Sequence, residues 1–145
     1  YWDWAGMKYV RDNVGIPIMA DESVHSPYDA IAGIRQDAMD MINIKLMKSG
    51  GILQSAKIAH IAEAANLPCM AGGMMESRIA VTATAHLVAS QKNVVFADLD
   101  AFMSHSVDPI VGGMEIKNGI VHLADSPGLG VEVAPEFMSK LRPVT

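Results

Sequence analysis

The stretch that decides the fold is Ile42-Asn43-Ile44-Lys45-Leu46-Met47-Lys48-Ser49-Gly50-Gly51. We interpret its first part as a short buried strand. Its two isoleucines point to one face, while Asn43 and Lys45 point to the other, because strand side chains alternate. A lysine at the exit of a buried strand is costly unless a site uses it or it reaches out to solvent. Lys45 is therefore a candidate functional residue, whereas we expect Lys48, past the strand end, to be a solvated turn lysine.

The same pattern recurs along the chain at nearly constant spacing. Short apolar runs end near residues 21, 45, 72 and 98, and a helix-like segment follows each of the first three. Ser26 and Pro27 are typical of a helix start, and Gly15 is expected to end the first helix. Glu76 either caps a later helix, which we favour, or faces the site. The expected strands are residues 16–20, 42–45, 67–71 and 94–97, and the expected helices are 7–14, 27–36, 52–65, 76–89 and 135–141.

Strand-helix units of about 26 residues indicate a parallel α/β sheet and fit a (β/α)8 barrel. A doubly wound open sheet is the alternative, but no Gly-x-Gly-x-x-Gly fingerprint follows any strand. Four units make half a barrel, over residues 1–104, so we expect the other half upstream of Tyr1 and the chain to be a fragment. Residues 105–145 contain short β-like runs between glycine-rich turns, and we expect this tail to pack on another part of the molecule.

Composition excludes several classes of protein. The net charge is −5 and no dense Lys/Arg run occurs, which argues against a nucleic-acid surface. No apolar run reaches the roughly 18 residues of a membrane span, and no signal peptide is recognisable. The single cysteine, Cys69, excludes an internal disulfide and fits a reducing cytoplasm, where a cysteine in an apolar strand is a buried small hydrophobe. The five histidines show no metal-ligand spacing.

Charged residues follow three of the four predicted strands. Asp21, Lys45 and then Asp98 with Asp100 lie at carboxyl ends, where barrels place their chemistry. A carboxylate beside a lysine suits a Mg²⁺ site that stabilises an oxyanion, with the lysine as acid or base. A cationic neighbour can lower the pKa of such a lysine towards the working pH.

These residues resemble a known family. Ala20-Asp21-Glu22-Ser23, followed by residues 42–51, resembles the C-terminal barrel half of the enolase superfamily, muconate-lactonizing subgroup. Asp98-Leu99-Asp100 is similar to the Asp-x-Asp motif of its dipeptide epimerases. The resemblance covers nearly the whole chain. It implies that the four strands are strands 5–8 of the barrel and that the tail packs on a capping domain absent from this sequence.

The resemblance also implies residue roles. Asp21 would be a metal ligand for Mg²⁺, Glu22 its neighbour paired with Lys45, and Lys45 one of two catalytic lysines. Four residues are expected to contact the substrate, although Met70 would equally suit flexible packing: Asp98, Asp100, Ser23 and Met70. The implied reaction is a 1,1-proton transfer that epimerises a dipeptide through an enediolate. The second lysine and two further metal ligands have no counterpart in this sequence.

Two alternatives stay open. One is another reaction of the subgroup, such as muconate cycloisomerisation or o-succinylbenzoate synthesis, whose substrates carry no ammonium group. The other is a non-catalytic half-barrel that pairs with another chain. The expected partners are a small dipeptide and the missing N-terminal half. Assembly with further copies of the chain is also expected, as in many such barrels, whereas no nucleic acid and no membrane are expected.

Overall fold

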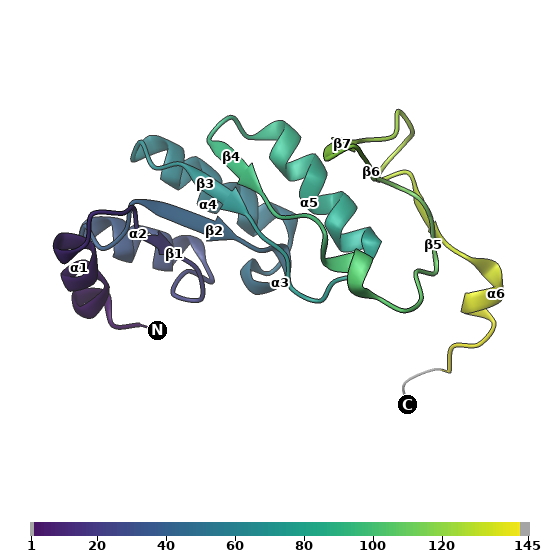
Figure 1. Cartoon of the computed structure of the whole chain (residues 1–145), viewed down its shortest axis with the longest axis horizontal. Helices are drawn as coiled ribbons and strands as arrows, with labels where there is room; N and C mark the ends of the chain where they lie inside the picture. Colours follow the sequence, from purple (N-terminus) through teal and green to yellow (C-terminus); the bar gives the residue numbers. More distant parts are fainter. Residues whose placement is uncertain (1, 143–145) are drawn as a thin grey trace.

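The computed structural model describes residues 2–142, so positions 1 and 143–145 of the predicted division into residues 1–104 and 105–145 lie outside the described residues. Its centre is a parallel sheet of four strands in the order β1-β2-β3-β4 (Figure 1). The strands are β1 (Met19–Ala20), β2 (Met41–Ile44), β3 (Cys69–Ala71) and β4 (Val94–Ala97). The predicted parallel α/β sheet is therefore present.

Helices connect the strands. They are α1 (Trp4–Asn13), α2 (Pro27–Arg35), the one-turn α3 (Leu46–Ser49), α4 (Ile52–Ala64) and α5 (Arg78–Ser90). The helix α2 packs against α4, and α4 against α5. Among residues 2–142, no helix combines the length and the apolar character that crossing a membrane requires.

The hydrophobic core lies between the sheet and these helices. Ile42 and Ile44 of β2 are almost completely buried and form one cluster with Cys69 and Ala71 of β3 and Ile58 of α4. Burial of each of the three isoleucine side chains stabilises the fold by roughly 1.5–3 kcal/mol. Asn43, which lies between Ile42 and Ile44, instead contacts the Asp21 side chain, as the predicted alternation along β2 requires.

Local signals at the helix ends were partly correct. The Ser26 side chain accepts the N–H of Asp29 at 3.2 Å and Pro27 is the first helical residue, as predicted. The prediction that Gly15 ends the first helix is wrong. Val14 already adopts an extended conformation, because the chain leaves α1 directly towards β1, and no left-handed residue is needed there.

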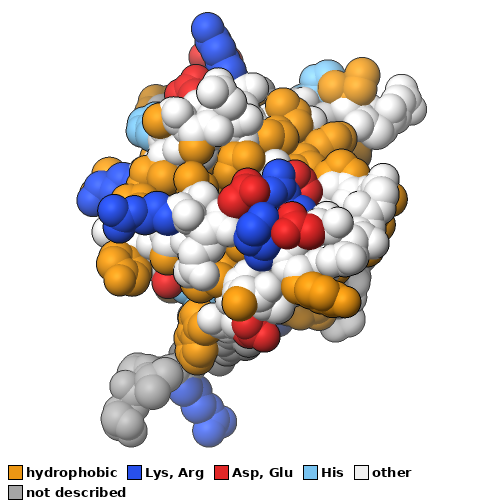
Figure 2. All heavy atoms as spheres, turned by 90° about the vertical axis from the view of Figure 1, so that its left-hand side faces the viewer, with side chains coloured by type: hydrophobic (Ala, Val, Ile, Leu, Met, Phe, Trp, Pro, Cys, Tyr) orange, Lys and Arg blue, Asp and Glu red, His pale blue; other side chains and the backbone are white. Residues whose placement is uncertain are grey.

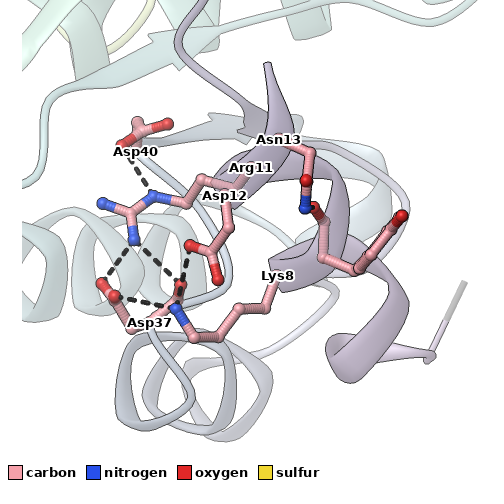
Figure 3. A network of polar contacts seen from close by, with 7 residues as sticks. Lys8, Arg11, Asp12, Asn13, Asp37 and Asp40 are labelled. Carbon is pink, nitrogen blue, oxygen red and sulfur yellow. Dashed lines mark hydrogen bonds and ion pairs between the residues drawn. The ribbon is translucent and has the colours of Figure 1, made fainter. Parts of the chain in front are cut away.

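An ion-pair network joins α1 to the turn before β2, at the amino ends of the strands. Figure 2 looks onto this end of the molecule and shows basic and acidic side chains gathered at its centre. Arg11 binds Asp37 at 2.7 Å and Asp40 at 2.8 Å, and Lys8 reaches Asp37 at 3.2 Å (Figure 3). Asp40 also accepts the N–H of Ile18 at 2.8 Å. This end therefore stabilises the fold and lies opposite the carboxyl ends of the strands.

The tail forms small antiparallel pairs at the end of the molecule away from α1 (Figure 1). After the 3-10 turn η1 (Ala101–Ser104), β5 (Ile110–Gly112) pairs with β8 (Val131–Val133), and β6 (Glu115–Lys117) pairs with β7 (Ile120–His122). The last helix, α6 (Pro135–Met138), is shorter than predicted.

Part of the tail packs on α5. Met114 is fully buried against Val81 and Ala85, and its N–H donates to the Thr82 hydroxyl at 3.1 Å. This contact lies within the chain, and the predicted packing of the tail on a capping domain stays a prediction.

Candidate active site at the carboxyl edge of the sheet

Asp21 and Lys45 meet at the carboxyl edge because they directly follow paired parallel strands. Ala20 lies opposite Ile42 in the register of β1 and β2, so both strands end at the same level. The Lys45 Nζ lies 2.8 Å from Asp21 Oδ2 and 3.0 Å from Glu22 Oε1. The Lys45 side chain is 12% exposed. The structure thus brings together the three residues that the sequence singled out.

Lys48 belongs to the same cluster, and its prediction as a solvated turn lysine is wrong. Its side chain is only 3% exposed. Its Nζ donates to Asp21 Oδ1 and to the Asn43 carbonyl, each at 2.9 Å, and to the Asp21 carbonyl. The cause is α3, whose single turn brings residue 48 back to the strand end before Gly50 closes it with a left-handed φ of 82°. The three-residue separation from Lys45 was the available signal.

The charges of this cluster shift one another's proton equilibria. Burial alone would raise the pKa of Asp21, but hydrogen bonds from Lys45 and Lys48 outweigh it and hold that pKa below its ordinary value. Burial likewise opposes the charge on Lys45, yet its bonds to Asp21 and Glu22 raise its pKa. For Lys48 burial dominates and lowers the pKa despite the Asp21 carboxylate. Asp21 is therefore a carboxylate near neutral pH.

Asn43 is a further site residue. The sequence predicted only that it shares a strand face with Lys45. Its Nδ2 donates to Asp21 Oδ2 at 3.1 Å. Its Oδ1 is buried and has no hydrogen-bond partner. Gly72, just after β3, packs directly on this amide, since a Cβ at position 72 would lie 2.5 Å from Asn43 Oδ1. The missed signal was its position two residues before Lys45, on the same strand face.

Asp98 and Asp100 lie just past β4, in a loop at the same edge. The N–H of Asp98 donates to the Ala71 carbonyl at 2.8 Å, and the intervening Leu99 is buried. A hydrogen bond between the two carboxyl groups, helped by burial, raises the pKa of Asp98, while the charge of Lys45 acts in the opposite direction. The predicted position of the pair on the eighth strand is wrong, because both residues lie in the loop after β4 ends at Ala97.

The remaining candidates take different positions. Ser23 is buried next to the Asp21 turn, and Met70 is half-buried on β3, in register with Asn43. Glu76 does not cap a helix as predicted. It is buried and accepts the N–H of Met74 in the preceding loop, because α5 begins only at Arg78.

Cys69 fits the expected buried hydrophobe. Its side chain is completely buried in β3. Burial raises the pKa of its thiol to about 12. The thiolate, which is the nucleophilic form, is therefore scarce at neutral pH.

The oxygen atoms at this edge fit a hard cation as part of a ligand set. The Asp21 carboxylate is an oxygen donor of the kind that Mg²⁺ prefers, and 33% of its side chain is exposed, so a cation can reach it. Within residues 2–142, no group of three or more His, Cys, Asp or Glu side chains could hold a metal ion. The described residues would therefore supply only a share of the ligands.

Comparisons with known proteins agree with this arrangement. The family described as enolase C-terminal domain-like matches residues 1–137. The L-Ala-D/L-Glu epimerase of Clostridium acetobutylicum is 47% identical over 90% of this chain and 37% of its own length. The hydrophobic dipeptide epimerase of Enterococcus faecalis is 44% identical over 89% of this chain and 37% of its own length.

Solved structures give the same result. The substrate-liganded L-Ala-D/L-Glu epimerase from Bacillus subtilis superposes with a TM-score of 0.88 at 42% identity, over 91% of this chain and 37% of that one. The dipeptide epimerase from Cytophaga hutchinsonii, complexed with Mg and the dipeptide D-Ala-L-Val, superposes with a TM-score of 0.92 at 35% identity. The match covers 96% of this chain and 38% of that one. The chain thus spans little more than a third of the length of the relatives it matches.

Proposed function

Since this chain belongs to the enolase C-terminal domain-like family, we propose that it forms the C-terminal barrel half of a Mg²⁺-dependent dipeptide epimerase. Membership confirms the resemblance drawn from residues 20–23 and 42–51. The observation that carries the proposal is the convergence of Lys45, Asp21 and the Asp98–Asp100 pair at one sheet edge. The similarity to curated dipeptide epimerases supports it.

Lys45 would transfer the proton at the α-carbon of the substrate. With Asp21 and Glu22 at hydrogen-bonding distance, its protonated form is favoured, so it is poised to donate a proton to one face of an enediolate. To remove a proton in the reverse direction, the ammonium must first lose one of these carboxylate partners. When bound at Asp21, Mg²⁺ would neutralise the substrate carboxylate and so stabilise the enediolate.

Asp98 and Asp100 would bind the α-ammonium of the dipeptide. The Asp100 carboxyl group raises the pKa of Asp98, and a bound ammonium would relieve the repulsion between the two groups when both are charged. This requirement favours substrates with a free amino group over the ammonium-free substrates of muconate cycloisomerases or o-succinylbenzoate synthases.

Other parts of the site would come from outside this chain. Because the chain spans little more than a third of its relatives, we propose that an N-terminal barrel half with a capping domain supplies the opposing lysine and the remaining metal ligands. We also propose that the protein works in a reducing cytoplasm, because its sequence contains a single cysteine and hence no internal disulfide.

The test is epimerisation by the complete natural polypeptide with Mg²⁺, followed by NMR, for dipeptides with a free and with an acetylated amino group. We expect turnover of the free dipeptides only. A hydrogen bond to a charged group contributes about 1.5–3 kcal/mol, so replacing both Asp98 and Asp100 by Asn should lower kcat/KM at least about 100-fold.

Asp125→Asn, at an exposed tail position, is the matched control and should leave kcat/KM unchanged. Equal turnover of acetylated dipeptides, or a double variant as active as the wild type, would refute the assignment of the ammonium site.

A further inference from the structure

We propose that Lys48 is a positioning residue that fixes the orientation of the Asp21 carboxylate relative to Lys45 and to a bound metal ion. The inference rests on the proposed function, because it assigns a role within the same site. It concerns a residue next to the strand end that was expected to be solvated and that the structure places among the most buried charges of the cluster.

The two oxygens of the Asp21 carboxylate have separate donors. Lys48 binds Oδ1 at 2.9 Å, whereas Lys45 and Asn43 bind Oδ2 at 2.8 and 3.1 Å. A carboxylate held from both sides cannot rotate without breaking at least one of these bonds. Oδ2 is thereby directed to the side where Lys45 lies.

Lys48 also fastens the backbone that carries Asp21. Its Nζ donates to the Asp21 carbonyl and to the Asn43 carbonyl, the latter at 2.9 Å. These carbonyls belong to the ends of β1 and β2, so one ammonium joins the two strand ends as well as the side chain. The position of Asp21 relative to β2 is therefore set by Lys48.

Burial of the Lys48 ammonium is costly, and its hydrogen bonds must compensate for the lost hydration. An ammonium with a 3% exposed side chain has lost most of its hydration. Its three acceptors all belong to Asp21 and Asn43. Without Lys48, Oδ1 of Asp21 would lose its donor, and the carboxylate would be held only at Oδ2 by Lys45 and Asn43. Lys48 thus fixes the orientation in which Asp21 presents Oδ2 to Lys45.

The test compares Lys48→Met, which has no donor, and Lys48→Gln, which keeps an uncharged donor, with the control Lys57→Met at an exposed position of α4. The complete natural polypeptide is titrated with Mg²⁺ by calorimetry, well below the unfolding temperature of each variant. Removing a residue that orients a metal ligand costs roughly 10–100-fold in metal affinity. We expect the Mg²⁺ Kd to rise by that factor in Lys48→Met, by less in Lys48→Gln, and to stay unchanged in the control.

A second readout requires no metal. The χ1 rotamer of Asp21, measured by NMR couplings or crystallography, should be single in the wild type and averaged in Lys48→Met. A merely structural lysine would lower Tm but leave both the Kd and the rotamer of the folded variants unchanged, and that result would overturn the proposal. If Lys48→Met does not fold, Lys48→Gln decides on the same two readouts.

The two proposals fail in distinguishable ways. A wild type that neither binds Mg²⁺ nor epimerises dipeptides refutes the proposed function. In that case the rotamer of Asp21 in the variants still decides whether Lys48 positions it.

Discussion

Gly72→Ala perturbs the site without removing any functional group. Gly72 follows β3, and its missing side chain leaves space for the Asn43 amide. A Cβ there would lie 2.5 Å from Oδ1 and 2.8 Å from Nδ2 of Asn43. Asn43 would have to retreat by roughly 1 Å to reach an ordinary van der Waals distance.

That shift should break the hydrogen bond from Asn43 to Asp21, which already measures 3.1 Å. A hydrogen bond to a charged group contributes about 1.5–3 kcal/mol. Alanine acts in the opposite direction, because it lowers the conformational entropy of the unfolded chain and so stabilises the fold by about 0.4–1 kcal/mol. We therefore expect Gly72→Ala to lower the free energy of unfolding by about 0.5–2.6 kcal/mol.

Gly15→Ala is the matched control. A Cβ at Gly15 meets no atom within 4 Å, and its backbone is not left-handed. It should raise the free energy of unfolding by about 0.4–1 kcal/mol. Urea denaturation followed by circular dichroism measures both variants. A Gly72→Ala protein as stable as Gly15→Ala would refute the close packing of Gly72 on Asn43.

Three further predictions concern the rest of the chain. The Ile18 N–H holds the pKa of Asp40 below its ordinary value, so Asp40 stabilises the fold above its unfolded pKa of about 3.9. This stability is lost as the pH falls through the lower folded pKa, and Asp40→Ala should flatten the acid limb of a pH series of urea denaturations. Arg78 contacts carbonyls of β5, so Arg78→Met should speed proteolysis within residues 105–142. Cys69 is buried and should react with a thiol reagent only on unfolding.

Controls separate these effects from general damage. Asp12→Asn removes an exposed partner of the same ion-pair network and should leave the acid limb unchanged. Arg35→Met, at the exposed end of α2, should not change proteolysis of the tail. Thiol labelling of the native protein as fast as that of the unfolded chain would contradict the burial of Cys69.

The convergence of Asp21, Lys45 and Asp98 was predictable from the sequence. Each follows an apolar run at a spacing near 26 residues, and parallel strands bring their carboxyl ends to one edge. The alternation of β2 correctly placed its isoleucines in the hydrophobic core and Asn43 and Lys45 beside Asp21. These features depend on periodicity, which a sequence displays directly.

The errors concern the path of the chain over single turns. Lys48 was expected in solvent because a residue after a strand is normally in a loop, but the one-turn helix α3 brings its side chain back to Asp21. Gly15 and Glu76 were assigned as helix caps, yet α1 ends before Val14 and α5 begins only at Arg78. Helix ends depend on which backbone groups the neighbouring strands and loops satisfy, and this is set by tertiary packing.

The most direct test is epimerisation of an Ala-Glu dipeptide in D₂O by the complete natural polypeptide and its Lys45→Ala variant, both with Mg²⁺. The account predicts that the wild type epimerises the dipeptide with deuterium incorporation at the α-carbon. The variant should bind the dipeptide with a similar Kd but lose epimerisation by roughly 10²–10⁴-fold. A Lys45→Ala protein that epimerises at a near wild-type rate would contradict the account.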